Sequence, residues 1–267
     1  MCRAFRSRKR LPRAPTRPAF SLIEALVVIA IISILLGLLA PAMSRAKSAS
    51  RSAKCLGNLK QMAIAAQNYA AIYDAWPTAI RYEVQQGVFK QIAWDWVTGG
   101  GSQLISPGPL WAFSTNPDEV QQCPDCNLSS TFGADPYTGY NYNATYLGGG
   151  ATFPLTGWAP VRKGVPPHAC ARSSTCAMFG DGAWKGGANK FMRAPLNSEG
   201  ELLSAIYAGG QAFRHAGWTN IAFIDGHTGS ANRPCKGKLA TLANLQQYMA
   251  YPANGFLSED DRAYDPR

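Results

Sequence analysis

The sequence predicts an α+β fold: a long N-terminal helix, with a transmembrane half and an amphipathic half, packed on a loop-rich antiparallel β-sheet head. Three observations predict it: an apolar run over residues 20–40, a helical stripe over 56–73, and many turn-forming residues beyond position 77. The chain has 267 residues, 46% of them hydrophobic and 16% charged, enough for one anchor and one packed domain.

Residues 1–19 form a basic leader with seven Lys and Arg residues and no acidic residue. This leader therefore carries +7 of the chain's net charge of +10 and leaves +3 on the rest. Because the remaining chain is nearly balanced in charge, nucleic-acid binding loses most of its electrostatic support, although the charge total leaves room for a local basic patch.

The apolar segment Phe20 to Ala40 contains one charged residue, Glu24. A helix of this length spans about 30 Å, the thickness of a bilayer core. Because the basic leader precedes it, the positive-inside rule places residues 1–19 in the cytoplasm and the C-terminal domain outside, in the periplasm or beyond the cell. We therefore predict a single-pass protein of the inner (cytoplasmic) membrane that contacts lipid through residues 20–41.

Three interpretations compete for this segment. It could be a secretory signal peptide cut after Ala42, since Ala40-Pro41-Ala42 fits a small-residue cleavage site. It could be a plain uncleaved anchor, or a leader cut before the apolar run. Glu24 favours the last, because a carboxylate at membrane depth costs roughly 2.5 kcal/mol or more and calls for a positively charged partner.

The residues from Ala19 to Ala25, AFSLIEA, followed by the apolar run, resemble the cleavage and methylation motif of type IV pilins and type II secretion pseudopilins. The resemblance implies that prepilin peptidase cuts between Ala19 and Phe20 and N-methylates Phe20. It also implies that Glu24 pairs with the N-terminal amine of a neighbouring subunit. Ala19 departs from the family's usual glycine, so we expect slower processing.

If the resemblance holds, the leader 1–19 is removed and the mature subunits self-assemble, with other pilin-like subunits, into a pilus-like or pseudopilus filament. The implied partners are prepilin peptidase and the secretion or pilus assembly machinery. Two alternatives remain open. One is an exported soluble domain, and the other is a membrane-tethered binding domain that does not polymerise.

Helical periodicity continues over residues 42–76. Apolar positions step by three and four residues through Leu56, Leu59, Ala63, Ala66, Ala70 and Tyr73. We interpret this stripe as the face that packs on the following domain. Pro41 is expected to kink the helix, and Trp76-Pro77 to end it.

Residues 77–267 are expected to form the globular head, with strands over 91–97, 175–179 and 219–224. Two apolar runs end in Asp-Gly, at Asp181-Gly182 and at Asp225-Gly226. Because Asp and Gly tolerate positive φ, each pair predicts a tight turn after a strand. A short helix is expected over 237–250 and a mobile polar tail over 258–267.

His215, nine further residues and then Asp225-Gly226 resemble a C-terminal His-X9-Asp-Gly signature of a large group of prepilin-like proteins. Cys123-Pro124 and the run Tyr140 to Asn143 also resemble that group. One role we consider is a buried hydrogen bond between His215 and Asp225 that fixes the last strand.

Seven cysteines leave six once the leader with Cys2 is removed, so disulfides become possible in an exported domain. Cys123 and Cys126 form a lone C-x-x-C, for which a structural disulfide is favoured over zinc because no second such element exists. Cys170 and Cys176 could also form a bridge.

No metal, cofactor or catalytic site is predicted. Asp181, His215, Asp225 and His227 form the candidate metal set, but they lie outside any acidic loop of the kind that calcium requires. The chain has three histidines and no common hydrolase, metalloprotease or phosphate-binding motif, so we expect a structural protein and not an enzyme.

Overall fold

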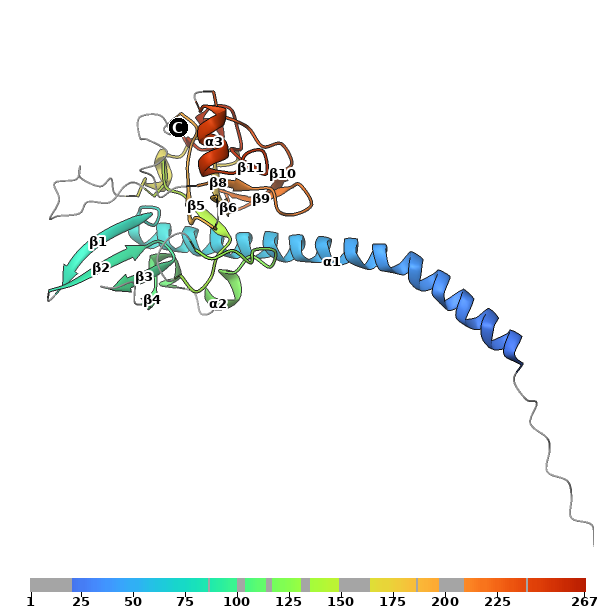
Figure 1. Ribbon diagram of the computed structural model, residues 1–267. Helices are drawn as coiled ribbons and strands as arrows, with labels where there is room; N and C mark the ends of the chain where they lie inside the picture. The colour runs from blue at the N-terminus through green and yellow to red at the C-terminus, as the bar shows by residue number, and fades with distance from the viewer. Residues whose placement is uncertain are drawn as a thin grey trace, which may run out of the picture. The chain divides into compact units, whose positions relative to one another are not determined.

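The computed structural model describes residues 21–85, 87–99, 104–113, 117–130, 135–148, 164–185, 187–196, 209–238 and 240–267. The chain divides into two compact units, Met1–Ala46 and Lys47–Arg267. Helix α1, Leu22–Tyr73, runs through the boundary between them (Figure 1). The α+β fold class is confirmed: a long N-terminal helix accompanies a head rich in antiparallel strands.

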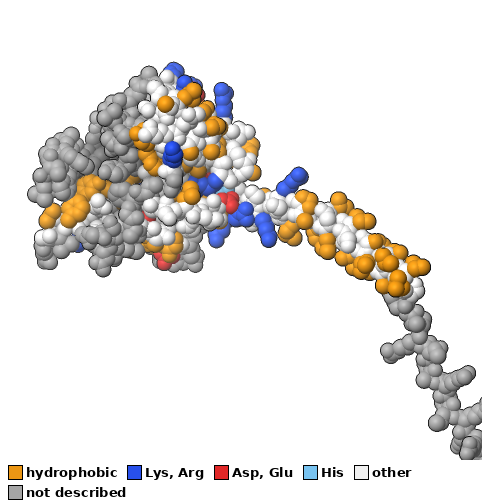
Figure 2. Space-filling model, viewed as in Figure 1, with side chains coloured by type: hydrophobic (Ala, Val, Ile, Leu, Met, Phe, Trp, Pro, Cys, Tyr) orange, Lys and Arg blue, Asp and Glu red, His pale blue; other side chains and the backbone are white. Residues whose placement is uncertain are grey.

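The first unit contains the apolar part of α1. Every side chain from Ser21 to Ala46 is exposed, and Figure 2 shows hydrophobic side chains along this stretch. The helix continues through Pro41. By length and composition, α1 is the one helix among the described residues that could cross a membrane.

The second unit buries one face of α1. The buried residues are Cys55, Asn58, Leu59, Met62, Ala63, Ala65, Ala66 and Ala70. The predicted stripe is thus confirmed at its centre, whereas Tyr73 is 55% exposed. The helix ends at Tyr73 because Asp74 adopts a left-handed conformation, with φ of 49°, before Trp76-Pro77 is reached.

A smaller antiparallel sheet follows the helix. Its strand order is β1-β2-β3-β4, with β1 Ile80–Gln85, β2 Val88–Ala93, β3 Trp96–Gly99 and β4 Leu104–Pro107. The single strand expected over 91–97 is wrong. The chain turns at Trp94-Asp95, where the buried Asp95 carboxylate accepts a hydrogen bond from the Trp96 amide (2.8 Å).

A larger sheet forms the rest of the head. Its main path is β10-β9-β6-β5-β7, with β8 pairing β6 and β11 pairing β8. The strands are β5 Tyr140–Asn143, β6 Ala177–Ala183, β7 Phe191–Met192, β8 Gly210–Ala212, β9 Thr219–Phe223, β10 Thr228–Ala231 and β11 Asn254–Gly255. The pair β5·β7 is parallel.

Strand β6 is buried along its whole length and contains both Asp181 and Gly182. The predicted turn at Asp181-Gly182 is therefore wrong. Asp181 pairs in register with Tyr140 of β5 and Gly182 with Gln211 of β8, so neighbouring strands continue the sheet past the Asp-Gly pair. The predicted strand over 219–224 is confirmed as β9.

The core lies where α1 meets both sheets. Trp94, Tyr142 and Phe179 pack there with ring centroids 5.1–5.8 Å apart. A buried ion group adjoins this core, since Nε1 of Trp94 donates to the carbonyl oxygen of Lys190 (3.1 Å). Nζ of Lys190 is 2.8 Å from Asp95 and 2.7 Å from Asp135.

Short helices complete the head: η2 Pro109–Trp111, α2 Pro117–Val120, η3 Pro167–Ala169, α3 Leu242–Tyr248 and η5 Asp261–Ala263. Helix α3 confirms the helix expected within 237–250. The tail expected to be mobile is instead packed, because Tyr264 is fully buried and its hydroxyl accepts from the Leu257 amide (2.7 Å).

Candidate functional site

The N-terminal motif begins at the edge of the described residues. Ala19 and Phe20, the predicted cleavage and methylation positions, lie outside them. Ser21 and Glu24 form a reciprocal cap on α1: the Ser21 amide donates to Oε2 of Glu24 (2.8 Å), and the Glu24 amide donates to Oγ of Ser21 (3.3 Å). Glu24 therefore stabilises the start of its own helix, and its carboxylate stays exposed.

The His-X9-Asp-Gly segment brackets strand β9. His215 is buried and forms an isolated bridge with Trp218 before the strand, whereas Asp225 and Gly226 form the turn between β9 and β10. Gly226 has φ of 86°, as the turn prediction required. The proposed hydrogen bond between His215 and Asp225 is wrong, because Oδ1 of Asp225 instead lies 2.6 Å from Nδ1 of the exposed His227.

The same segment is fastened to α1 by side chains of the helix. Nζ of Lys60 donates to the carbonyl oxygen of Gly226 (2.6 Å), and Nε2 of Gln67 donates to that of Ile224 (3.2 Å). Nδ2 of Asn220 donates to Oγ of Ser52 (3.2 Å). These three contacts hold β9 and its turn against the helix.

A buried group of metal-ligand type lies beneath this contact. It consists of Cys55 from α1, Cys123 from the loop before β5, Asp181 from β6 and His215 from the signature. Their ligand atoms all lie within 4.8 Å of one another, and all four residues are buried. We call these four residues the Cys-Cys-Asp-His cluster. It contains two of the four residues in the metal set considered from sequence, Asp181 and His215.

Charges in the cluster are strongly coupled. A hydrogen bond from Cys55, supported by one from His215, lowers the pKa of Cys123 to about 5. The same sulfur–sulfur contact, with burial, raises the pKa of Cys55 far above its usual range. Burial lowers the pKa of His215, but hydrogen bonds to Asp181 and Cys123 outweigh it and raise the value to about 10. The geometry therefore favours a Cys123 thiolate beside a protonated His215.

Further polar groups support the cluster from outside. Nδ1 of His215 lies 2.8 Å from Oδ2 of Asp125, and Arg51 of α1 forms an ion pair with the same carboxylate. The Asn220 amide donates to Oδ2 of Asp181 (2.7 Å). Arg214 lies beside Cys123 and donates to the carbonyl oxygen of Gly139 (3.0 Å).

The loop of residues 123–126 contributes Cys123 to the cluster and Asp125 to its surroundings. Cys123 and Cys126 are buried free thiols, not the disulfide considered from sequence. Sγ of Cys123 faces Asp181 and His215, whereas Sγ of Cys126 lies 3.7 Å from Oγ1 of Thr138. Gly139 allows the loop to close over the cluster, since its φ is 114° and a Cβ there would collide with both cysteines.

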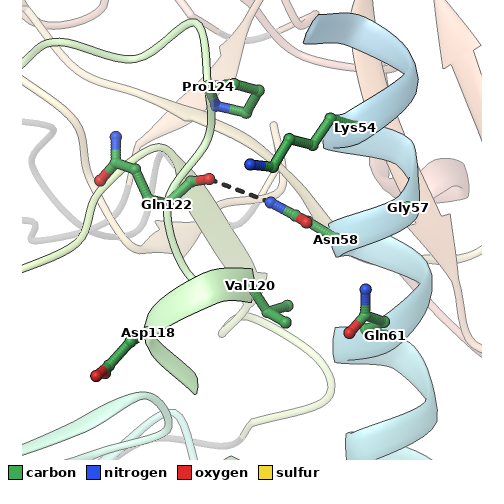
Figure 3. A pocket seen from close by; sticks show the side chains of 8 residues that line it. All are labelled: Lys54, Gly57, Asn58, Gln61, Asp118, Val120, Gln122 and Pro124. Atoms are coloured by element: carbon green, nitrogen blue, oxygen red, sulfur yellow. Dashed lines mark hydrogen bonds between the residues drawn. The ribbon is translucent and has the colours of Figure 1, made fainter. Parts of the chain in front are cut away.

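A pocket of about 660 Å³ lies between α1 and the segment made of α2 and the loop that carries Cys123 (Figure 3). Lys54, Gly57, Asn58 and Gln61 of the helix line one side, and Asp118, Val120, Gln122 and Pro124 line the other. Nδ2 of Asn58 spans the two sides by donating to the carbonyl oxygen of Gln122 (3.1 Å). The pocket is open to solvent and gathers no set of reactive groups.

Sequence reasoning missed Cys55, Asp125 and Arg51. Cys55 could have been found, because it precedes Leu59 and Met62 on the buried face of the helix. Asp125 and Arg51 carried no signal, since their roles depend on contacts between residues 74 positions apart.

Comparison with protein families gives two matches. Residues 17–40 match the prokaryotic N-terminal methylation motif, and residues 44–99 match a family described as a protein of unknown function (DUF1559). No curated protein and no solved structure matched the chain. The matches agree with a type IV pilin-like protein: the motif indicates a prepilin-peptidase substrate, and with the apolar helix it indicates a single membrane anchor.

Proposed function

We propose that this chain is a structural subunit of a type IV pilus-like filament or of a type II secretion pseudopilus. Prepilin peptidase cuts between Ala19 and Phe20 and methylates Phe20, and the apolar part of α1 then leaves the membrane to bundle with the helices of other subunits. The head faces the periplasm or exterior and carries no catalytic function in this proposal. The assembly machinery and other pilin-like subunits are its partners.

One observation carries the proposal: the methylation motif, residues 17–40, includes the start of a helix whose apolar side chains are all exposed from Leu22 to Ala46. Such a surface is stable only in lipid or against other apolar helices. The membrane provides the lipid before assembly, and a filament provides the other apolar helices afterwards. The exposed Glu24 carboxylate then meets the new N-terminal ammonium of a neighbouring subunit, a pairing that favours one register.

The alternatives receive less support. Signal peptidase cleavage after Ala42 would cut within α1, which continues as helix from Leu22 to Tyr73. A tethered domain that never polymerises is compatible with the apolar helix, but it uses Glu24 only as a helix cap and gives its negative charge no partner.

The first experiment determines the mature N-terminus, by mass spectrometry of protein purified from its native membrane. A chain that starts at an N-methylated Phe20 supports processing by prepilin peptidase. A chain that starts at Met43 overturns it in favour of ordinary secretion.

Assembly is tested with a matched pair, Glu24→Gln and Glu24→Ala. Gln retains the cap with Ser21 but lacks the charge, whereas Ala lacks both. We expect both variants to enter the membrane and both to lose filament or crosslinked-helix formation. Normal assembly of Glu24→Gln would show that the charge has no part in it.

A further inference from the structure

The Cys-Cys-Asp-His cluster has the dimensions of a tetrahedral metal site. Sγ of Cys55 lies 3.3 Å and Sγ of Cys123 lies 3.8 Å from Oδ1 of Asp181. Nε2 of His215 lies 3.9 Å from Sγ of Cys123 and 3.3 Å from Oδ2 of Asp181. Zinc bonds of about 2.3 Å to sulfur and about 2.0–2.1 Å to nitrogen or oxygen place tetrahedral ligand atoms roughly 3.3–3.8 Å apart.

The surroundings hold the ligands in the orientation that a metal requires. His215 turns Nε2 into the cluster while Nδ1 contacts Asp125, the carboxylate–histidine arrangement that fixes the tautomer of metal-binding histidines. Asp125 is held in turn by Arg51, and Asp181 by the Asn220 amide. Three of the four ligands thus have a preset position on rigid elements: a helix, the central strand and the segment before β9.

The charges also balance. Binding of the ion would release the thiol proton of Cys55 and the Nε2 proton of His215 to solvent. Two thiolates and one carboxylate then carry three negative charges, and a divalent ion leaves one negative charge. Arg214, which lies beside Cys123 and feels the Asp181 and Cys123 charges, neutralises the last. A buried site with no net charge is far less costly than the same ligands alone.

We propose that Cys55, Cys123, Asp181 and His215 bind a structural Zn²⁺ ion that fastens the head to helix α1. Two thiolates and an imidazole select zinc over calcium or magnesium, which require oxygen ligands. Four buried protein ligands leave no open position for a substrate, so the site is structural and not catalytic.

The competing outcome is a disulfide between Cys55 and Cys123, whose sulfur atoms lie within 4.8 Å of each other. Such a bond would cross-link the same two segments without a metal. The two outcomes differ in mass and in thiol chemistry, so one preparation distinguishes them.

The test uses the full chain, purified in detergent without added metal and without reductant. Elemental analysis against protein concentration is expected to give one zinc per chain, and native mass spectrometry a species heavier by one zinc ion. After chelation, Cys55 and Cys123 should become open to alkylation, and Zn²⁺ alone should restore their protection and the melting temperature. Replacement by Co²⁺ should give the intense visible absorption of a tetrahedral thiolate site.

Variants assign the ligands. Cys55→Ser and His215→Ala are expected to lose stoichiometric zinc, whereas Cys170→Ser and Cys235→Ser, outside the cluster, retain it. Because ligand variants can unfold, His215→Cys is included as a replacement ligand that should retain zinc and change the cobalt spectrum. A metal-free chain in which the thiols of Cys55 and Cys123 are both free overturns the proposal. So does a metal-free chain whose mass is lower by two hydrogens because Cys55 is linked to Cys123 in a disulfide.

Discussion

The two parts of helix α1 are both apolar, but they use apolar residues differently. From Leu22 to Ala46 the side chains are mostly large and branched, and all are exposed. From Lys47 to Tyr73 the buried face is built largely of small residues, namely Ala63, Ala65, Ala66 and Ala70. Small residues let the backbone approach the sheets closely, whereas large ones form a surface for lipid or for other helices.

The difference shows that the first part is not built to be buried inside the head. Fully burying one large aliphatic side chain contributes about 1.5–3 kcal/mol, and this part leaves all of its own exposed. Its stabilising environment must come from outside the chain. The second part instead finds its partners within the chain, up to 168 residues away.

The largest expected effect comes from charging the first part. The double variant Ile32→Arg, Leu35→Arg adds roughly 5–7 kcal/mol to the cost of membrane insertion, on the scale of about 2.5–3.5 kcal/mol for each arginine. We expect the protein to leave the membrane fraction while the head remains resistant to protease. Ala53→Arg, at an exposed position of the second part, is the control and should stay in the membrane. Full membrane retention of the double variant would contradict the anchor.

A smaller effect is expected from the buried face of the second part. Leu59 is fully buried, so Leu59→Ala should lower the free energy of unfolding of the head by about 2–5 kcal/mol. Ile64, 43% exposed on the same helix, is the matched control, and Ile64→Ala should cost under ~1 kcal/mol. Urea unfolding of detergent-solubilised protein measures both. Equal costs would show that the face is wrongly assigned.

The smallest effect is expected at the turn that α1 holds. Gly226→Ala places a methyl group at positive φ, and its Cβ would lie 2.8 Å from Nε2 of Gln67 on the helix. Gly217 has the same φ of 86° with no neighbour within 4 Å, so Gly217→Ala isolates the backbone cost of about 1 kcal/mol. Thermal unfolding should show a greater loss for Gly226→Ala than for Gly217→Ala. In a Gln67→Ala background, which already lacks the hydrogen bond to Ile224, the two glycine substitutions should cost the same. An equal loss in both single variants would show that the contact with Gln67 is unimportant.

The helix could be predicted from the sequence because its signals are local. The apolar run, the charge at Glu24 and the three–four spacing from Leu59 to Ala70 each depend on residues within a few turns of one another. The helix end was missed by three residues, because left-handed geometry at Asp74 has no reliable sequence signal.

The head was harder to predict because its pairings are distant. Asp181-Gly182 and Asp225-Gly226 look alike in sequence, yet only the second is a turn. Strands β5 and β8 pair with β6 at Asp181 and Gly182, and no residue near this pair in the sequence predicts that pairing. His215 and Asp225 were expected to meet, but they lie at opposite ends of strand β9, and Nε2 of His215 faces Cys123 and Asp181 instead.

The buried face of α1 is completed only by partners that are synthesised long after it. Cys55 meets Asp181 126 residues later, and Lys60 meets Gly226 166 residues later. Contacts of such sequence separation make folding slow. The helix can therefore enter the membrane early, while Leu59, Met62 and the Cys55 thiol remain uncovered until β9 emerges. During that interval the uncovered face of α1 can pack against other nascent chains. Correct folding of each copy therefore depends on keeping nascent chains apart.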